Sequence, residues 1–378
     1  MRKLLLTLAI GVILLGACAG PSAPPAPAET PAPTPTPVPT PAPTPSPVPT
    51  PPPKPTPAPT PTEPPAPVET PAPTPTPVPF PTPSPEADIP IIDAHSQVGT
   101  FSELGEHWDL NKIMQLINEA GVARTILMAR GAVTPEQLVS FASEHPGKIV
   151  PAIRITSAIY ANNDPRYYTF LNKQANMPQF GAMGEVLMYH GQKPAGKGRS
   201  VPEMVVYPDD ERVQAALDCT IEKKWPFMVH IEFGAAGSLR DEFMNKLKAL
   251  LLRYPEHPFV LVHMGQLNYF DVRQLIEAHP NIHFTTSHSH PFIVRNAMQP
   301  WTNMFDGDRL SADWKQLMTD HPDRFILAFD NVLVEAWGLY SSNVVPLWRE
   351  AIKELPIEVA HTFAHGNAER LWRLQPVE

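Results

Sequence analysis

The chain has little cysteine, no excess of positive charge and no dinucleotide-binding fingerprint. Only two cysteines occur in 378 residues, so disulfides do not hold the folded part together. The formal net charge of −9 argues against nucleic acid as a partner and against electrostatic binding to anionic lipids. No Gly-x-Gly-x-x-Gly follows the first predicted strand, which removes the main reason to expect a dinucleotide fold.

The N-terminus has an apolar run that is too short for a membrane span. Arg2 and Lys3 precede an apolar stretch from Leu4 to Leu15, a pattern that indicates a signal peptide. The following Leu-Gly-Ala-Cys18 resembles the bacterial lipobox, in which the cysteine becomes the lipidated N-terminus. We therefore expect residues 1–18 to be a lipoprotein signal, and the exported protein to be anchored to the bacterial cell membrane through Cys18. Ordinary signal cleavage, with Cys18 incidental, is the alternative.

Proline is in large excess in the next part of the chain. About two-thirds of the 51 prolines lie between Pro21 and Pro90, and the segment ETPAPTPTPVP occurs twice, from Glu29 and from Glu69. Such a sequence lacks backbone donors for a sheet and apolar side chains for a core, so it favours extended polyproline II. We predict a disordered linker over residues 19–88 that acts as a stalk. A proline-rich ligand for a recognition domain is the competing interpretation.

Residues 89–378 alternate between strand-like and helix-like stretches. The short, apolar strand candidates are Ile91–Ala94, Arg124–Ala129, Ile149–Ile155, Gly181–Leu187, Phe227–Glu232, Phe259–His263, Ile282–Thr286 and Phe325–Phe329. The amphipathic helix candidates include Leu110–Glu119, Glu211–Lys224, Arg240–Arg253, Val272–Ala278 and Val344–Glu354. Eight strands that alternate with helices predict an α/β fold, a (β/α)8 TIM barrel, as one domain.

Five of the apolar runs end on a residue that can bind a metal ion. They supply His95 with Gln97 two residues later, Glu185, His230, His263 and Asp330. Because the carboxyl ends of barrel strands meet at one rim, we expect these side chains to lie together. Imidazoles and carboxylates bind divalent ions, most readily Zn²⁺, and one or two ions are expected here. Such an ion lowers the pKa of bound water, which predicts metal-assisted hydrolysis.

The same motifs resemble the amidohydrolase superfamily, most closely its amidohydrolase-related branch of TIM-barrel enzymes. IIDAHSQ resembles the I-D-x-H-x-H of the family's first strand, and MGE its fourth-strand Gly-Glu. MVHIE, LVHMG and LAFDN resemble the fifth-strand His, the sixth-strand His and the eighth-strand Asp, and HGNAERLW resembles the closing segment of many members. The resemblance runs from Ile91 to the C-terminus.

The resemblance implies a metal-dependent hydrolase that acts on an amide, ester or lactone-like bond of a small molecule. By the family pattern, His263 polarises the substrate carbonyl and Asp330 accepts the proton of the attacking water. His95, His230 and Asp330 would form the core of one metal site, and Glu185 would bridge to a second ion held by His230 and His263. Decarboxylation or hydration is the alternative activity, because this branch also includes lyases.

One position departs from the family pattern. Gln97 stands where the family usually has its second His, and a neutral amide oxygen is a weaker Zn²⁺ ligand than imidazole. Three outcomes are open: the ion still binds while Gln97 orients water, a harder ion replaces zinc, or the domain is a metal-poor, non-catalytic binding barrel.

Several further residues receive a role from the sequence. His190, His288 and His290 follow the fourth and seventh predicted strands, and we expect them to contact substrate. We expect Asp93 to support the first turn, Cys219 to be a buried structural thiol, and Trp301, Trp314 and Trp337 to pack the barrel. The substrate and the oligomeric state are not encoded in any of these patterns.

Overall fold

The computed structural model describes residues 88–98, 110–131, 133–155, 158–196, 199–297, 299–332 and 334–377. Cys18, the predicted signal peptide and nearly all of the predicted stalk lie outside these residues. No helix in the described part of the chain combines the length and the apolar character that a bilayer crossing needs. The predicted domain boundaries and the membrane anchor therefore stay predictions.

All eight predicted strands are present, and the fourth is divided in two. The eight are β1 (Ile92–Val98), β2 (Arg124–Ala129), β3 (Ile149–Ile153), the pair β4 (Ala182–Met183) and β5 (Val186–His190), β9 (Phe227–Ile231), β10 (Phe259–Leu261), β11 (Ile282–Thr285) and β14 (Phe325–Ile326). The break falls at Gly184 and Glu185. A Cβ on Gly184 would lie 2.8 Å from the Ile153 carbonyl oxygen, so glycine lets the chain pass close to β3 just before Glu185.

The strands of the predicted barrel belong to two sheets and are parallel to their neighbours, while two further sheets in the described residues are two-stranded hairpins. The first sheet has the order β1-β2-β3-β4 and the second β14-β11-β10-β9-β5-β8, with only β8 (Met204–Val205) antiparallel to its neighbour. Backbone hydrogen bonds from Ala94 to Leu327 and from Asp330 to His95 join β1 to the segment after β14. The α/β class with parallel strands is confirmed, whereas a continuous eight-stranded ladder is not observed and the closed barrel stays a prediction.

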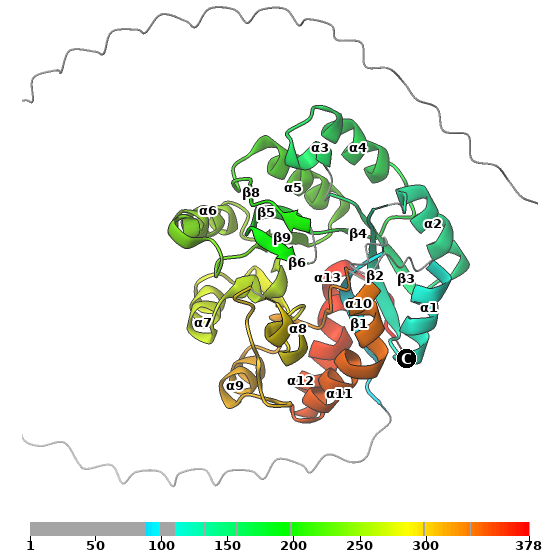
Figure 1. Cartoon of the computed structure of the whole chain (residues 1–378), viewed down its shortest axis with the longest axis vertical. Coiled ribbons are helices and arrows are strands. Elements are labelled where there is room, and N and C mark those ends of the chain that lie inside the picture. The colour runs from blue at the N-terminus through cyan, green and yellow to red at the C-terminus, as the bar shows by residue number, and fades with distance from the viewer. Residues whose placement is uncertain are drawn as a thin grey trace, which may run out of the picture. The chain divides into compact units, whose positions relative to one another are not determined.

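Helices surround the strands on their outer side (Figure 1). They are α1 (Leu110–Glu119), α2 (Pro135–Glu144), α3 (Ala158–Ala161), α4 (Arg166–Ala175), α5 (Glu211–Lys223), α6 (Arg240–Arg253), α7 (Tyr269–Ala278), α8 (Pro291–Asn296), α9 (Ala312–Asp320), α10 (Val334–Leu339), α11 (Val345–Lys353), α12 (Ile357–His361) and α13 (Asn367–Trp372). Local caps start several of them. Thr134 and Gln137 form a reciprocal capping box on α2, and Asn268 caps α7.

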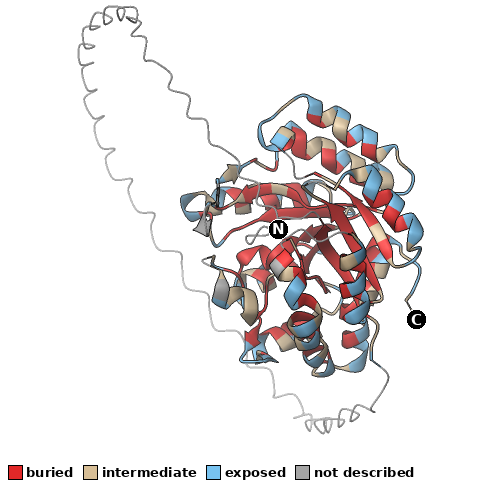
Figure 2. Cartoon of the chain, turned by 45° about the vertical axis from the view of Figure 1, so that its right-hand side comes forward, coloured by how far each residue is buried: buried red, intermediate tan, exposed pale blue. Residues whose placement is uncertain are grey.

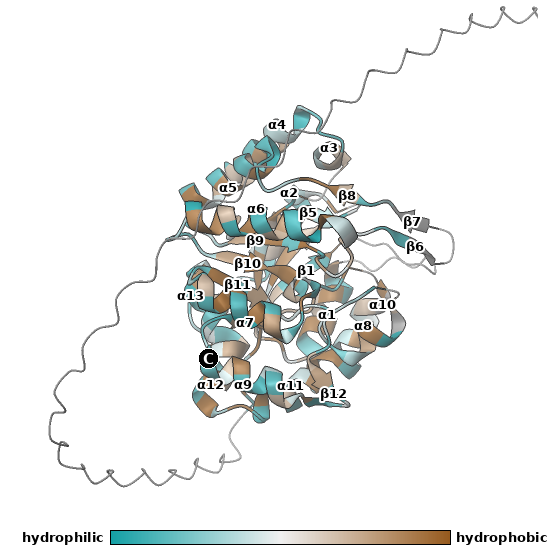
Figure 3. Ribbon diagram, turned by 90° about the vertical axis from the view of Figure 1, so that its left-hand side faces the viewer, coloured by the Kyte–Doolittle hydropathy of each residue, from teal (hydrophilic) through white to brown (hydrophobic). Residues whose placement is uncertain are grey.

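The strands are buried, while the helices bury only their inner faces (Figure 2). One apolar cluster lies between strands and helices, and a second collects alternate strand residues from both sheets, among them Ile92, Met128, Met228 and Ile326. The apolar strands β9, β10 and β11 lie side by side in register (Figure 3). Alternate residues therefore pack inward and outward along each strand, as strands covered on both faces require.

The longest connecting segments follow the fourth and seventh predicted strands. The first holds the end of β5, the hairpin of β6 (Lys193–Gly196) and β7 (Arg199–Val201), and then β8. The second holds α8 and the hairpin of β12 (Phe305–Asp306) and β13 (Arg309–Leu310). Both connecting segments begin at the carboxyl ends of strands, so they lie where side chains from several strands meet.

Candidate functional site

Four side chains from four separate strand ends surround one point inside the protein. We call His95, Glu185, His263 and Asp330 the central cluster; each is at most 3% exposed. His95 Nε2 lies 3.5 Å from Asp330 Oδ1 and 3.8 Å from Glu185 Oε2. His263 Nε2 lies 3.5 Å from Asp330 Oδ2 and 3.8 Å from Glu185 Oε2. The structure thus brings together residues that are up to 235 positions apart, as the sequence predicted; their role stays a prediction.

The imidazoles of the central cluster are short of hydrogen-bond partners. Both ring nitrogens of His95 and Nδ1 of His263 are buried and have no hydrogen-bond partner among the described residues. Burial, together with the neighbouring imidazoles of His288, His230 and His95, lowers the pKa of His263 well below its usual value. A neutral imidazole has a free lone pair, and buried polar groups without partners call for an explanation such as a bound ion.

The backbone is unusual at the same residues. His263, Met264 and Gln266 have φ values of 56°, 54° and 54°, and Asp330 has a φ of 51°. His288, at 58°, is a further non-glycine residue in this left-handed region. Each such conformation costs about 1–3 kcal/mol and persists only where the surroundings impose it. The left-handed residues gather at the strand ends that carry His263, His288 and Asp330, which makes this region the candidate functional site.

Gln97 lies beside the central cluster with a defined amide orientation. Its Nε2 donates to Glu185 Oε1 at 2.9 Å and to Asp330 Oδ1 at 2.8 Å. Its Oε1 accepts from Arg130 Nη1 at 2.7 Å. The amide oxygen, which is the atom a metal ion would bind, therefore points to a guanidinium and away from the two carboxylates.

His230 is held between two carboxylates. Its Nδ1 lies 2.7 Å from Glu185 Oε2 and its Nε2 lies 3.1 Å from Glu232 Oε1. Burial opposes a charged imidazole, but Glu185 and Glu232 outweigh it and raise the pKa of His230 to about 9. Burial likewise opposes the charge on Glu185, yet the charge and hydrogen bond of His230 hold the pKa of that carboxyl well below its usual range. The sequence grouped His230 with His95 and Asp330, whereas in the structure His263 is grouped with those two. The structure does bring Glu185, His230 and His263 together, as predicted for a second ion, and the binding of that ion stays a prediction.

Several predicted substrate contacts lie around this centre. His288 stacks on His263 with ring centroids 4.5 Å apart, and its Nε2 is 3.6 Å from Asp330 Oδ2. The His190 ring is 5.6 Å from the ring of His230. His290 is buried, which lowers its pKa to about 3, and no contact joins it to the central cluster. A role in substrate binding stays a prediction for all three.

Four neighbours of the centre received no functional role from the sequence. Glu232 binds His230, and Lys193 Nζ lies 3.0 Å from Glu232 Oε1. Lys193 also lies 4.9 Å from the Trp301 ring centroid, and Trp301 contacts the rings of His263 and His288. Arg130, the fourth neighbour, directly follows the second strand. Glu232 is two residues after His230, a spacing that places two side chains on one face of a strand. The positions of Arg130 and Glu232 along the sequence could therefore have identified them as site residues.

Asp93 supports the first strand, as expected. Its Oδ1 accepts from the backbone N–H groups of His95 and Phe329, each at 3.2 Å, and its Oδ2 accepts from Ser96 Oγ at 2.6 Å. Burial raises the pKa of Asp93 to about 7, although these donors act in the opposite direction. The carboxylate thereby ties the first strand to the segment after the last one.

Trp301, Trp314 and Trp337 are buried, as expected for residues that pack the domain. Cys219 is half-buried in α5, where burial raises its thiol pKa to about 11.

The donor set of the central cluster fits a divalent ion. Four ligands at about 2.0–2.2 Å in tetrahedral geometry lie roughly 3.3–3.6 Å apart. His95 and His263 lie 3.5 Å from different oxygens of Asp330, and each lies 3.8 Å from Glu185 Oε2. The ligand atoms of His95, His263 and Asp330 lie within 4.8 Å of one another, and so do those of Glu185, His230 and His263. His230 Nδ1 and Glu185 Oε2, 2.7 Å apart, form a hydrogen bond within the second of these groups.

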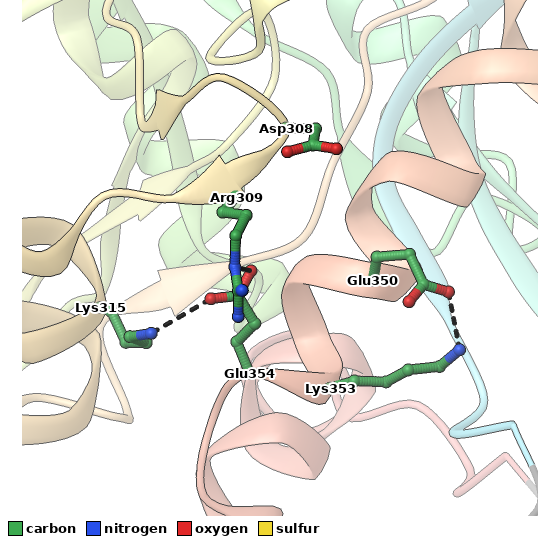
Figure 4. Close-up of a pocket in the computed structure, with 6 residues that line it drawn as sticks. All are labelled: Asp308, Arg309, Lys315, Glu350, Lys353 and Glu354. Atoms are coloured by element: carbon green, nitrogen blue, oxygen red, sulfur yellow. Dashed lines mark hydrogen bonds and ion pairs between the residues drawn. The ribbon is translucent and has the colours of Figure 1, made fainter.

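A second polar region is a surface cleft of about 510 Å³ (Figure 4). It is lined by Asp308, Arg309, Lys315, Glu350, Lys353 and Glu354, and none of the central cluster residues reaches it. Opposite charges pair across it, with Lys315 3.1 Å from Glu354 and Lys353 2.7 Å from Glu350.

Comparison with known proteins relates part of the chain to a family. An amidohydrolase family model matches residues 190–374, which contain His230, His263 and Asp330 but not His95, Gln97 or Glu185. The matched segment is slightly less than half of the 378 residues. Among curated proteins there is no sequence match.

Solved structures of similar architecture share little sequence with the chain. The 5-carboxyvanillate decarboxylase of Sphingomonas paucimobilis is 13% identical over 76% of this chain and 100% of its own, with a TM-score of 0.49. The enzyme of the same name from Novosphingobium aromaticivorans, in complex with manganese, is 14% identical over 75% and 96%, with a TM-score of 0.47. A probable 2-pyrone-4,6-dicarboxylic acid hydrolase from Acinetobacter baumannii is 12% identical over 75% and 99%, with a TM-score of 0.44. At TM-scores below 0.5 these likenesses decide neither fold nor activity.

Proposed function

We propose that the chain is a metal-dependent enzyme of the amidohydrolase family that acts on a small molecule at the central cluster. The observation that carries this proposal is the set of four separations of 3.5 to 3.8 Å between two imidazoles and two carboxylates. The family match over residues 190–374 supports it independently. Zn²⁺ and Mn²⁺ both suit a site of nitrogen and oxygen donors.

Hydrolysis of an amide, ester or lactone-like bond is the first candidate reaction. A divalent ion held by His95, Glu185, His263 and Asp330 would supply Lewis acidity and lower the pKa of coordinated water. Asp330 is positioned to take a proton, since its Oδ2 faces both His263 and His288. His288 and Trp301, which contact each other and His263, form an apolar and aromatic wall against which a substrate can be oriented.

Decarboxylation of a small carboxylic acid is the second candidate. The observation in its favour is the Lys193 ammonium, which lies beside Trp301 and Glu232 at the edge of the site. Its side chain is 28% exposed, so it can meet a substrate carboxylate that enters from solvent. Hydrolysis does not need a cation at this position, whereas a carboxylic acid substrate gains from it.

One set of measurements separates these activities from a metal-free binding role. Purified protein is analysed for bound metal and then assayed against esters, lactones and amides for hydrolysis, and against carboxylic acids for CO₂ release. We expect metal in the wild type, little in Asp330→Asn, and turnover in one of the two panels. Wild-type protein that is folded, free of metal and unable to bind added Zn²⁺ or Mn²⁺ would refute the proposal and favour the binding barrel.

We also propose that the protein is exported and lipid-anchored, on the basis of the Leu-Gly-Ala-Cys18 motif and the preceding charged and apolar residues. The proline-rich residues 19–88 would then separate the catalytic domain from the membrane. Labelled fatty acid should be incorporated into the wild type, and Cys18→Ser should abolish this labelling and release the protein from the membrane fraction. Equal labelling of both proteins would refute the assignment of Cys18.

A further inference from the structure

Gln97 and Arg130 form a hydrogen-bonded relay that ends on two members of the central cluster. Arg130 Nη1 donates to Gln97 Oε1, and Gln97 Nε2 donates to one oxygen of Glu185 and one oxygen of Asp330. All three bonds are between 2.7 and 2.9 Å, and Gln97 is fully buried. The two amide hydrogens thus join two carboxylates that come from different strand ends.

Only one orientation of the Gln97 amide satisfies these neighbours. If the amide were turned over, its NH₂ would face the Arg130 guanidinium, so that donors would meet donors. Its oxygen would then face Glu185 Oε1 and Asp330 Oδ1, so that acceptors would meet acceptors. Coordination of an ion through the Gln97 oxygen requires this unfavourable orientation. Arg130 therefore fixes the side chain as a donor.

The relay leaves specific carboxylate oxygens for an ion. Gln97 occupies Glu185 Oε1 and Asp330 Oδ1, while Glu185 Oε2 and Asp330 Oδ2 face His263. On the other side, the 2.7 Å hydrogen bond from His230 occupies the remaining approach to Glu185 Oε2. Asp330 Oδ1, which accepts from Gln97, is also 3.5 Å from His95 Nε2, so the amide holds this carboxylate between the two imidazoles.

We infer that Gln97 is a positioning residue and not a metal ligand, and that Arg130 holds its amide in the orientation that donates to Glu185 and Asp330. This inference rests on the proposed function and refines it, because the sequence left open whether Gln97 is a metal ligand. Outer partners that orient ligating carboxylates typically contribute 10- to 100-fold in metal affinity.

The test is a metal titration of the metal-free full-length chain with Zn²⁺ and, separately, Mn²⁺. Elemental analysis gives the stoichiometry and competition with a chromophoric chelator gives the dissociation constant. Arg130→Met and Gln97→Met should each bind as many ions per chain as the wild type, with affinity lowered roughly 10- to 100-fold. Arg130→Lys, which keeps a donor to the amide oxygen, should recover part of that loss.

Arg154→Met is the matched control. Arg154 lies near Arg130 and its Nη1 contacts the backbone oxygen of Gly131, so the variant removes an equal charge without removing a contact to Gln97. Its metal affinity should stay within about twofold of the wild type. Circular dichroism and thermal melting of the metal-free proteins check that each variant folds, and Arg130→Lys serves if Arg130→Met does not.

The outcomes distinguish this inference from the proposed function. Unchanged affinity in the Arg130 and Gln97 variants, or an equal loss in Arg154→Met, would overturn the inference and leave the proposed function intact. The absence of any metal binding by the folded wild type would overturn both.

Discussion

The central cluster and the surface cleft are both rich in charged or ionisable groups, yet they differ in every physical respect. In the cleft, long side chains pair in the presence of water, and the Arg309 side chain is 73% exposed. In the central cluster each residue is at most 3% exposed, imidazole nitrogens have no hydrogen-bond partner and two residues have a left-handed backbone. Most charged side chains of the cleft are paired, whereas the buried imidazoles of the central cluster have ring nitrogens without a hydrogen-bond partner among the described residues.

The difference follows from the cost of burial. An exposed ion pair changes stability by about 0–1 kcal/mol because water solvates each partner anyway. A buried polar group without a partner costs about 1–3 kcal/mol, and strained backbone adds to this. A protein keeps such an arrangement when another component satisfies it, which is the physical reason to place the reaction at the central cluster.

The largest expected effect is the loss of metal binding on changing the central cluster. His263→Gln and Asp330→Asn should each reduce bound metal from about one ion to less than a tenth, and should lower turnover by roughly 10³-fold or more, since both remove a ligand from a preorganised site. Elemental analysis and steady-state assays measure this. In the cleft, Glu354→Gln should leave bound metal and turnover within about twofold of their wild-type values. Equal losses in the two regions would contradict the comparison.

Metal removal should destabilise the folded protein by a smaller amount. An ion that binds only the native state raises the free energy of unfolding by about 2.7 kcal/mol when its free concentration is 100 times its dissociation constant. Chelator should therefore lower Tm of the wild type and of Glu354→Gln equally. His95→Ala should show no metal-dependent shift in Tm. A persistent shift in that variant would mean that the ion binds elsewhere.

A buried histidine outside the site should make stability depend on pH. Burial lowers the pKa of His283, in β11, to about 4 from its usual 6.5. As the pH falls through 6.5 the unfolded chain takes up a proton that the folded protein resists, so stability is full above pH 6.5 and declines toward pH 4. Between pH 7.5 and 4.5, the free energy of unfolding measured with urea should fall by about 2 kcal/mol less in His283→Gln than in the wild type.

The smallest effect is expected in the cleft itself. Lys315→Ala removes an ion pair with Glu354 in which the Lys315 side chain is 37% exposed, so the free energy of unfolding should change by less than about 1 kcal/mol. The change should shrink further at high salt, because exposed charges are screened. A loss of several kcal/mol would show that the cleft is more than a solvated surface.

Most of the fold was predictable because strands buried on both faces are short apolar runs. The limits of β2 agree with the prediction residue for residue, and so do those of α1 and α6. The division of the fourth strand at Gly184 was not predicted, since it depends on a close approach to Ile153 that no local pattern reveals. β1 also extends to Val98, four residues beyond the predicted end, because it pairs with β2 up to Ala129.

The members of the candidate site were largely predictable, and their partnerships only in part. Strand-end position identified His95, Glu185, His263 and Asp330, and the predicted grouping of Glu185, His230 and His263 is present in the structure. His230 was also expected beside His95 and Asp330, but in the structure it is turned between Glu185 and Glu232. Side-chain direction depends on contacts between distant strands, so spacing along one strand does not determine it.

The amino-acid sequence alone determined which residue types arrive at the strand ends, because alternating apolar patterns fix which segments become buried strands. Only the tertiary structure decided which atoms face one another there. The amide of Gln97 is neutral and has both donors and an acceptor, so its identity is compatible with a ligand or with a donor. The neighbouring Arg130 guanidinium decides between the two by occupying the amide oxygen.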